Sequence, residues 1–473
     1  MSDTYKRLYN RAINETRSIT FNQSFGLSNH RVLVPLGVSL IFLLLVALIV
    51  GAGFSRYEEA LLIAFAAVIG GYMAINIGAN DVANNMGPAV GGKVLTVGGA
   101  ILIAFICEAA GALLAGGDVV QTVSKGIITP NEDISVVDFR FLMLSALLAA
   151  ALWINLATLL GAPVSTTHSI VGGVMGSGIA AAGLGLVNWA TMSKIAASWV
   201  ISPLFGACVA ALLLFFIKVK IFDQKNRAAA AIKWVPILIG LMAAAFAAYM
   251  AMKGLKKIWQ PSTIEITVFA LMAFSGVYFA ARPYIAKSLN GLSGDTKSIN
   301  ALFHIPLIAG AALLSFAHGA NDVANAVGPI AAIVSTIGEG SDIANKVSIP
   351  FWIMVIGAFG IALGVGLFGP KLITIVGEKI TRLNAPRAYC VALSSAITVL
   401  IATTLGLPVS STHIAVGAVF GIGFLREFTE NPKGKKRRLV RRKFAISIAA
   451  AWVITVPASA LLSALIYKLL LLL

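Results

Sequence analysis

Apolar runs of roughly 20 residues, the length needed to span a ~30 Å hydrocarbon core as an α-helix, recur along almost the whole chain. Short polar stretches separate them, and none is long enough for a sizeable soluble domain. The pattern therefore predicts an all-α polytopic membrane protein with about thirteen transmembrane segments. The predicted segments are 33–53, 58–79, 94–116, 139–160, 165–184, 191–217, 234–252, 264–281, 302–320, 351–369, 388–405, 411–425 and 444–471.

The composition agrees with this pattern, since 58% of the residues are hydrophobic, 12% are charged and the mean hydropathy is +0.90. The net charge of +17 raises nucleic acid binding as an alternative, but the basic residues occupy short loops between apolar runs. That placement follows the positive-inside rule, so we expect a lipid bilayer around the chain and no nucleic acid partner. The sequence contains no nucleotide-binding loop, metal-ligand cluster or nucleophile constellation, so we expect neither an enzyme nor a cofactor.

The most basic loops predict the orientation in the membrane. Residues 218–233 carry five Lys and Arg against one Asp, and residues 426–443 carry nine against two Glu, so both should be cytoplasmic. With thirteen crossings the N-terminus is then inside and the C-terminus outside. The polar stretch 1–32 is interpreted as a leader to the first membrane helix and not as a cleaved signal peptide. Lys253 and two lysines after it are an exception, because they fall on the external side.

Two polar motifs occur twice. The stretch from Gly78 to Val90, GANDVANNMGPAV, reappears from Gly319 to Ala331 with nine positions identical, and GAPVSTTH from Gly161 matches GLPVSSTH from Gly406 at six of eight positions. An odd number of predicted crossings separates the two copies of the first motif. The chain is therefore predicted to contain two inverted-topology repeats with interrupted helices around a central site. The predicted parts are a leader with an extra helix (1–57), the first repeat (58–217), a linking loop with two helices (218–301) and the second repeat (302–473).

The second motif favours an anion site. Proline interrupts the preceding helix and suits the first turn of a new one, and the hydroxyl residues after it can cap the new N-terminus. Such an N-terminus at membrane depth offers N–H groups, hydroxyls and the positive end of the helix dipole to an oxyanion. Interhelical or capping hydrogen bonds are the alternative role, and they are favoured for His168 and His413. The predicted anion donors are Ser165, Thr166, Thr167, Ser410, Ser411 and Thr412.

The first motif supplies oxygen ligands for cations. Amide and carboxylate oxygens suit a hard cation such as Na⁺, and the carboxylates can instead accept protons or a hydrogen bond from a protonated anion. We expect the adjoining Gly-Pro pairs to end each helix and to free backbone carbonyls. Glu108, an acid inside an apolar run, aligns with Ile361 in the second half and is not duplicated; a structural role is its alternative. The predicted cation ligands are Asp81, Asp322, Asn84, Asn325 and Glu108, with Asp81 and Asp322 as the sodium ligands, while Asn80 and Asn321 are predicted to contact the anion.

The four motif copies contain no Lys or Arg. An anion buried beside Asp81 and Asp322 is strongly disfavoured in a low-dielectric site unless cations accompany it. The sequence therefore predicts coupled transport, in which cations and anion cross together along an ion gradient.

Both motif pairs, with Glu108 in the sequence Phe105-Ile-Cys-Glu108, resemble the inorganic phosphate transporter (PiT) family from about residue 58 to the C-terminus. The Asn-Asp motifs and the stretch from Ala451 to Pro457 look closer to its sodium-coupled branch. The resemblance implies a secondary symporter that imports inorganic phosphate with sodium across a plasma or bacterial inner membrane, with the Asp, Asn, Ser and Thr residues above lining its sites. The extra helix at 33–53 departs from the usual twelve-helix plan of the family.

Several alternatives stay open. Protons can replace sodium as the coupling ion, and the substrate can be sulfate or another oxyanion. Phosphate is favoured over sulfate because it carries an O–H group whose proton a carboxylate can accept. A nutrient sensor with a transporter fold is disfavoured, because the chain has no sizeable soluble domain to pass on a signal. Stoichiometry, affinity and oligomeric state are not predicted, with a homodimer as one candidate.

Overall fold

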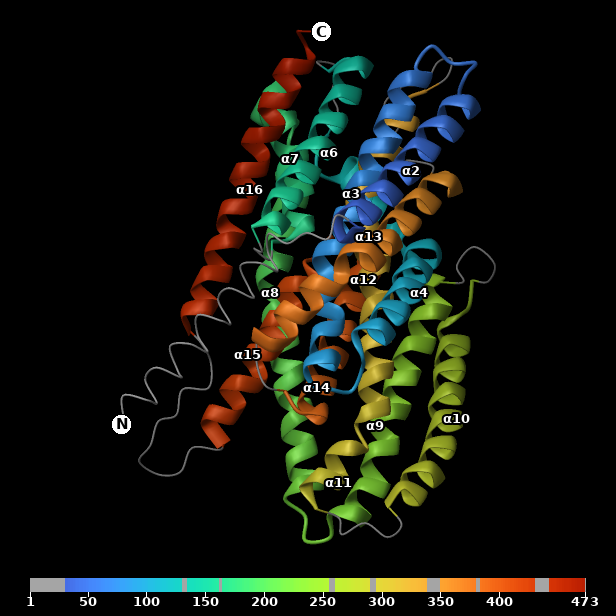
Figure 1. Ribbon diagram of the computed structural model, residues 1–473, viewed down its shortest axis with the longest axis vertical. Helices are drawn as coiled ribbons and strands as arrows, with labels where there is room; N and C mark the ends of the chain where they lie inside the picture. The colour runs from blue at the N-terminus through green and yellow to red at the C-terminus, as the bar shows by residue number, and fades with distance from the viewer. Residues whose placement is uncertain are drawn as a thin grey trace. The chain divides into compact units, whose positions relative to one another are not determined.

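Figure 1 shows the computed structural model of the chain, which describes residues 30–129, 134–160, 164–254, 260–289, 295–337, 349–379, 383–429 and 442–472. The chain forms two units, Met1–Leu45 and Val46–Leu473. The described part of the first unit is the beginning of helix α2 (His30–Gly53). The second unit contains both copies of each motif.

Every predicted membrane segment is an α-helix, which confirms the all-α architecture. Within the described residues, eleven helices are long and apolar enough to cross a membrane. The helices α7 (Thr166–Ala182) and α15 (Ser411–Thr429) are not among them. The other helices are α3 (Ala60–Gly91), α4 (Val97–Ala115), α5 (Gly117–Gln121), α6 (Val136–Leu159), α8 (Trp189–Ile217), α9 (Arg227–Tyr249), α10 (Thr263–Leu289), α11 (Thr296–Ala301), α12 (His304–Val334), α13 (Phe351–Lys379), α14 (Ala385–Thr404) and α16 (Arg442–Leu470).

The first motif lies inside a continuous helix in both halves, so the prediction that its Gly-Pro pair ends the helix and frees carbonyls is wrong. Helix α3 continues through Pro88 to Gly91, and α12 continues through Pro329 to Val334. A proline removes one backbone hydrogen bond, and membrane helices tolerate this loss when neighbouring helices and local adjustments satisfy the freed group. The polar side chains of the motif consequently project from within a long helix.

The second motif does interrupt the helices, as predicted. In Figure 1, α6 and α7 lie side by side in the upper part of the unit, and α14 and α15 lie in the lower part. Gly406 closes the end of α14 with φ +66°, a left-handed conformation that glycine adopts without strain. The residues at the two turns, among them Val164 and Val409, are buried inside the unit. Each pair therefore forms a hairpin whose turn is surrounded by protein, a setting in which non-helical backbone is tolerated at membrane depth.

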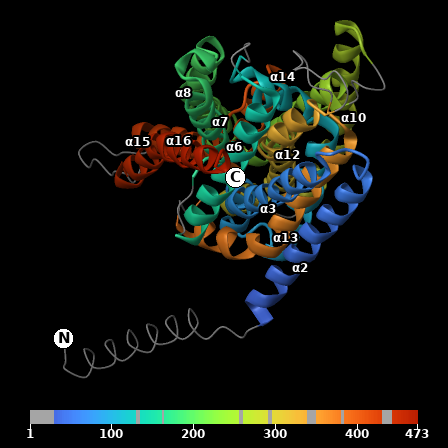
Figure 2. The ribbon, with the colours of Figure 1, turned by 90° about the horizontal axis from the view of Figure 1, so that it is seen from above.

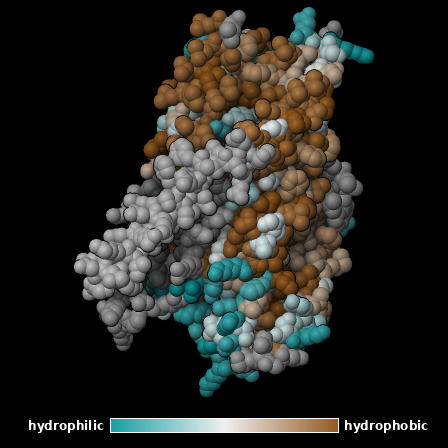
Figure 3. Space-filling view, in the orientation of Figure 1, coloured by the Kyte–Doolittle hydropathy of each residue, from teal (hydrophilic) through white to brown (hydrophobic). Residues whose placement is uncertain are grey.

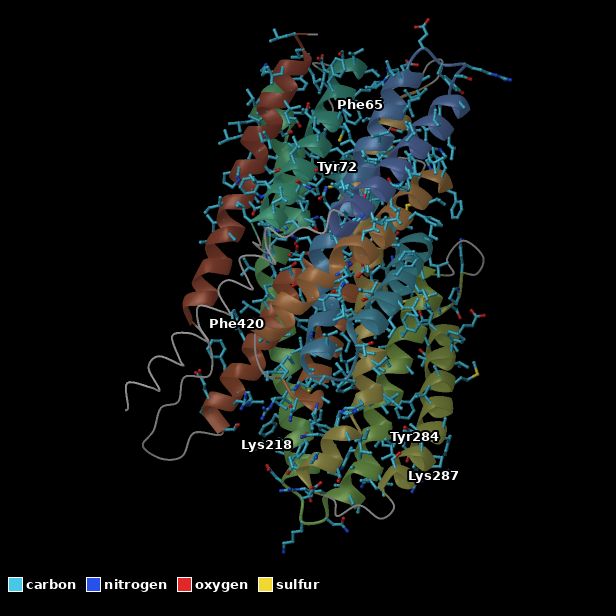
Figure 4. All side chains as sticks on the ribbon, in the orientation of Figure 1. Phe65, Tyr72, Lys218, Tyr284, Lys287 and Phe420 are labelled. Carbon is cyan, nitrogen blue, oxygen red and sulfur yellow. The ribbon has the colours of Figure 1, made fainter. Side chains whose placement is uncertain are left out.

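We expect the hairpins to lower the number of crossings without changing the predicted orientation. A hairpin that enters and leaves on the same side replaces two predicted crossings by none, so every loop would remain on the side that the loop charges assign to it. Figure 3 shows a large group of hydrophilic residues at the lower end of the second unit and a smaller group at its upper right, and Figure 4 places Lys218 and Lys287 at the lower end. Large apolar side chains cover the outer faces above it, such as Leu212 of α8 and Phe279 of α10, which are 67% and 68% exposed. Such a surface is typical of a protein that spans a membrane.

Lys253, which the predicted orientation places on the external side, has an acidic partner in the structure. Lys253, in the π-helical segment Met250–Gly254, forms an ion pair with Asp118 of α5. A paired lysine between helices is held by its counter-ion and carries little information on orientation. The two lysines that follow it lie outside the described residues.

Close contacts between helices follow the inverted repeat. A Cβ atom added at Gly78 of α3 would lie 2.0 Å from the backbone oxygen of Ile361 in α13, and one added at Gly319 of α12 would lie 2.0 Å from the backbone oxygen of Glu108 in α4. Small residues allow such close backbone approach in membrane proteins. Each motif helix thus packs against a helix of the opposite half, as Figure 2 shows for α3 and α13. The same relation holds for Gly364 against Ile75 and for Gly111 against Phe316, each also at 2.0 Å.

The orientation is tested with single cysteines at two exposed loop positions, Arg56 and Lys225, in a background without Cys107, Cys208 and Cys390. Because the basic loop 218–233 is assigned to the inside, an impermeant thiol reagent added to intact cells should label Arg56→Cys. The same reagent should label Lys225→Cys only after the cells are permeabilised. Labelling of Lys225→Cys in intact cells would contradict the orientation.

The close helix crossings predict a stability effect. Gly319→Ala should lower the stability of the folded protein by about 1–3 kcal/mol, because the added methyl group collides with backbone and not with a flexible side chain. Gly276→Ala in α10 is the matched control, since its Cβ would meet no atom within 4 Å. That substitution should raise stability by up to about 1 kcal/mol through helix propensity. Thermal unfolding in detergent compares the two variants, and equal unfolding temperatures would refute the packing argument.

Candidate functional site

All four motif copies meet at one buried centre. The first motif contributes side chains from the middle of α3 and α12, and the second contributes the N-termini of α7 and α15. The side chains of Asp81 and Asp322 are 0% and 1% exposed in relative terms. Every Ser and Thr that the sequence assigned to the anion is also buried. The structure therefore brings the predicted cation and anion residues into a single polar cluster.

Hydrogen bonds between carboxylates and hydroxyls connect the two halves across this centre. Thr412 Oγ1, at the start of α15, donates to Asp81 Oδ1 at 2.9 Å, and Thr166 Oγ1, at the start of α7, donates to Asp322 Oδ2 at 3.1 Å. In each case the hairpin of one repeat satisfies the acid of the other. Bonds from an O–H group to a carboxylate are stronger than those between neutral groups. The hairpin tips are thereby fixed against the two motif helices.

The second amide of each motif extends the same connection. Asn84 donates to Thr412 Oγ1 at 2.8 Å and to Asp81 Oδ1 at 3.3 Å. Asn325 donates from Nδ2 to Thr167 Oγ1 at 3.1 Å and to Thr166 Oγ1 at 3.4 Å. Because the amide nitrogens are occupied, the side-chain oxygens of both residues remain available as cation ligands.

The first amide of each motif anchors a hairpin of its own repeat. Asn80 Nδ2 donates to Thr158 Oγ1 at 2.9 Å near the end of α6, and Asn321 Nδ2 donates to Thr403 Oγ1 at 3.0 Å near the end of α14. Asn321 Oδ1 also accepts a bond from the backbone N–H of Val409. These amides join the long helices to the turns, a role that the sequence did not predict for them.

The serine hydroxyls of the two turns differ in what they contact. Ser165 Oγ caps α7 by accepting the N–H of His168, and Ser410 Oγ accepts the N–H of His413 in the same way. Within the described part of the chain, the buried Ser411 hydroxyl has no hydrogen-bond partner. Ser411 is accordingly the hydroxyl that is most available to a ligand.

The two motif histidines meet where the hairpin tips converge. The rings of His168 and His413 have centroids 4.5 Å apart, and the ring of Trp199 from α8 stacks on His168 at 3.7 Å. The Nδ1 atom of His168 also lies 2.7 Å from Ser165 Oγ. These contacts agree with the supporting role that the sequence favoured for both residues.

A histidine outside the predicted set lies between the two acids. His318 Nε2 is 3.3 Å from Asp322 Oδ2 and 3.7 Å from Asp81 Oδ2, and His318 Nδ1 is 3.1 Å from Glu108 Oε2. Comparison of the repeats does not identify this residue, because it directly precedes the second motif copy and aligns with Ile77, which is apolar. Its signal in the sequence is a lone histidine next to a motif inside an apolar run.

The centre has the geometry of a cation site. One ligand atom from each of Asp81, His318 and Asp322 can be chosen so that all three lie within 4.8 Å of one another. Two adjacent helix N-termini and their hydroxyls supply donors for an anion beside it. Candidate ligands for a cation and donors for an oxyanion therefore lie side by side here.

Comparison with known proteins agrees with this geometry. Residues 77–463 match the model of the phosphate transporter family PHO4. A solved structure described as the sodium-dependent phosphate transporter superposes with a TM-score of 0.81 at 38% identity, over 87% of this chain and 99% of that chain.

Two similar proteins also carry names that refer to phosphate transport. A Helicobacter pylori protein named as a candidate phosphate permease is 51% identical over 418 residues, which cover 87% of this chain and 76% of that protein. Inorganic phosphate transporter 2-1, a chloroplastic protein of Arabidopsis thaliana, is 35% identical over 84% of this chain and 70% of its own length. The family consists of transporters, which separates the chain from enzymes. Because these matches extend over most of the chain and the four motif copies meet at one centre, we conclude that the chain belongs to the phosphate transporter family.

Proposed function

We propose that the protein is a secondary symporter that imports inorganic phosphate across a cell membrane together with sodium ions. The observation that carries the proposal is the direct bonding of two buried carboxylates to the hydroxyls of two helix N-termini. Cation ligands and anion donors are thereby parts of one connected cluster. We take residues 58–217 and 302–473 as the two repeats that build it.

The acids of the cluster supply the cation site. Two carboxylates this deeply buried are costly without a compensating positive charge. Oxygen ligands from carboxylates and amides suit a hard cation such as Na⁺, and Asp81, Asp322, Asn84 and Asn325 offer them around one centre. The solved structure that this chain resembles is described as sodium-dependent, which favours sodium over the proton as the coupling ion.

The hairpin tips supply the phosphate site. The beginnings of α7 and α15 offer N–H groups and the hydroxyls of Ser165, Thr166, Thr167, Ser410, Ser411 and Thr412, and a helix N-terminus favours anions. Phosphate near neutral pH also carries an O–H that a carboxylate oxygen can accept, whereas sulfate carries none. A sulfate carrier is therefore the weaker candidate.

Cation and anion binding are coupled through shared hydrogen bonds. In the structure the hydroxyls of Thr412 and Thr166 donate to Asp81 and Asp322. A cation that coordinates a carboxylate weakens the hydrogen bonds from these hydroxyls to that carboxylate. The released O–H groups can then donate to a phosphate oxygen. The anion then binds at sites that the cation has prepared, and the cation's charge offsets the repulsion from the two acids.

Removal of one charge tests the cation role. Asp81→Asn and Asp322→Asn should each abolish phosphate uptake driven by a sodium gradient in proteoliposomes, because Asn keeps the shape and loses the charge. Asp138→Asn is the matched control, since the carboxylate of Asp138 accepts hydrogen bonds from Ser135, the N-cap residue of α6, and from Tyr467, away from the centre. Both motif variants should unfold at temperatures close to that of the wild type. Near-normal uptake by either variant would show that the substituted acid is not part of the coupling site.

Hydroxyl removal tests the phosphate role. Loss of a hydrogen bond to a charged ligand costs about 1.5–3 kcal/mol, so Ser411→Ala should raise the apparent KM for phosphate on the order of ten- to a hundred-fold at saturating sodium. The apparent KM for sodium at saturating phosphate should change less. Ser177→Ala is the control, because this hydroxyl bonds within its own helix to Gly173. A change confined to the sodium titration would assign Ser411 to the cation.

The coupling ion is decided in the same vesicles. Uptake should follow a sodium gradient at constant pH and should not follow a pH gradient without sodium. Uptake driven by a pH gradient alone would favour the proton, and competition by sulfate as strong as that by phosphate would favour a broader oxyanion carrier.

A further inference from the structure

Three polar residues of the centre break the symmetry of the duplicated halves. Through the motif alignment, Asn85 corresponds to Ala326 and His318 corresponds to Ile77, while Glu108 corresponds to Ile361. Each of these three polar residues thus has an apolar residue at the aligned position in the other half. All three are fully buried, with relative exposures of 0% or 1%.

These three residues form a connected chain. Asn85 Nδ2 on α3 donates to Glu108 Oε1 on α4 at 2.9 Å, and Glu108 Oε2 lies 3.1 Å from His318 Nδ1 on α12. One carboxylate therefore joins three helices. Since the opposite ring nitrogen of His318 faces Asp322 and Asp81, the chain ends on the two acids of the cation site.

The helix crossing itself does not require polar residues. Gly319 packs on the backbone of Glu108 at the same 2.0 Å distance at which Gly78 packs on the backbone of Ile361. The second crossing carries Ile77 and Ile361, and both belong to one buried hydrophobic cluster. An apolar pair therefore satisfies the same geometry. Packing alone does not account for a buried acid and histidine at the first crossing, because such groups are costly to bury.

The histidine gives the unpartnered oxygens of the two acids different surroundings. Asp322 Oδ2 receives Thr166 and faces His318, whereas Asp322 Oδ1 has no hydrogen-bond partner among the described residues. Asp81 Oδ1 receives both Thr412 and Asn84, while Asp81 Oδ2 has no hydrogen-bond partner among the described residues and lies 3.7 Å from His318 Nε2. Each acid therefore keeps one oxygen without a hydrogen bond, and His318 approaches that oxygen in Asp81 but the bonded oxygen in Asp322.

We propose that Glu108 and Asn85 are positioning residues that hold the His318 ring against Asp81 and Asp322 and so make the cation site asymmetric. Glu108 acts on the cation through His318 and is not itself a ligand. A carboxylate beside one ring nitrogen fixes the orientation and tautomer of a histidine whose other nitrogen faces a metal site. This inference rests on the proposed role of Asp81 and Asp322 as cation ligands.

A double-mutant cycle between Glu108→Ile and His318→Ile tests the proposal. The double variant installs at this crossing the isoleucine pair that the other crossing already carries, so it should fold. Phosphate uptake into proteoliposomes is measured as a function of sodium at saturating phosphate and of phosphate at saturating sodium. Loss of a residue that orients a ligand histidine typically weakens metal binding about 10- to 100-fold, so Glu108→Ile alone should raise the apparent KM for sodium by that factor. The apparent KM for phosphate should change less.

The cycle separates an indirect role from a direct one. If Glu108 acts through His318, adding Glu108→Ile to His318→Ile should leave the sodium KM unchanged. Glu108→Gln, which keeps an acceptor oxygen for the ring, should retain most of the wild-type sodium affinity, and this rescue is not expected if the charge of Glu108 binds the cation directly. Asn85→Ala, which copies Ala326, should raise the sodium KM in the wild-type background and not in His318→Ile, and it serves where an isoleucine variant does not fold.

Two results would overturn the inference in distinguishable ways. Additive effects of Glu108→Ile and His318→Ile, with wild-type uptake still dependent on sodium, would make Glu108 a direct ligand and leave the proposed function intact. Wild-type uptake that ignores the cation gradient would overturn the proposed function, and the positioning role with it.

Discussion

The hydrogen bonds that satisfy the carboxylates of Asp81 and Asp322 are the interaction on which the rest of the structure depends. Both acids are buried, and the motifs around them contain no Lys or Arg, so the hydroxyls and amides that donate to them must stabilise the charge together with the His318 ring between them. The hydroxyls come from Thr412 and Thr166, each at the start of a half-helix. A hairpin must therefore reach the centre from each side, and each long helix must carry its acid at the same depth. The inverted repeat satisfies both requirements, because each half supplies one long helix with an acid and one hairpin.

Close helix packing makes this arrangement possible. Gly78 and Gly319 allow each motif helix to touch the backbone of a helix from the other half. A larger residue at either position would separate the helices and move the acids away from the hairpin tips that serve them. Glycine here contributes by the absence of a side chain, and polar contacts a few residues further along the same helices depend on that closeness.

The sequence predicts the repeats, the helical segments and most of the site because each depends on a local pattern. Apolar runs locate the helices, and duplication draws attention to Asp81, Asp322 and the hydroxyl residues. The continuity of α3 through Pro88 was not predictable, because it depends on neighbours that compensate for the lost hydrogen bond. The hairpins were counted as crossings because a half-helix of apolar residues has nearly the composition of a full one. His318 was missed because only its contact with Asp322 is local in sequence, whereas its contacts with Asp81 and Glu108 come from α3 and α4, which are distant in sequence.

Duplication alone would produce two equivalent half-sites, whereas the proposed symport requires unlike ligands to bind side by side. The residues shared by both halves supply what either ligand needs: acids, amides, hydroxyls and helix N-termini. Asn85, Glu108 and His318 are present in one half only, and they lie at a crossing whose counterpart is filled by isoleucines. Since the same glycine contact supports both crossings, polar residues could replace apolar ones at one of them without a change of fold. The repeated residues thus form the shared polar centre, and the unrepeated ones give the two acids different surroundings.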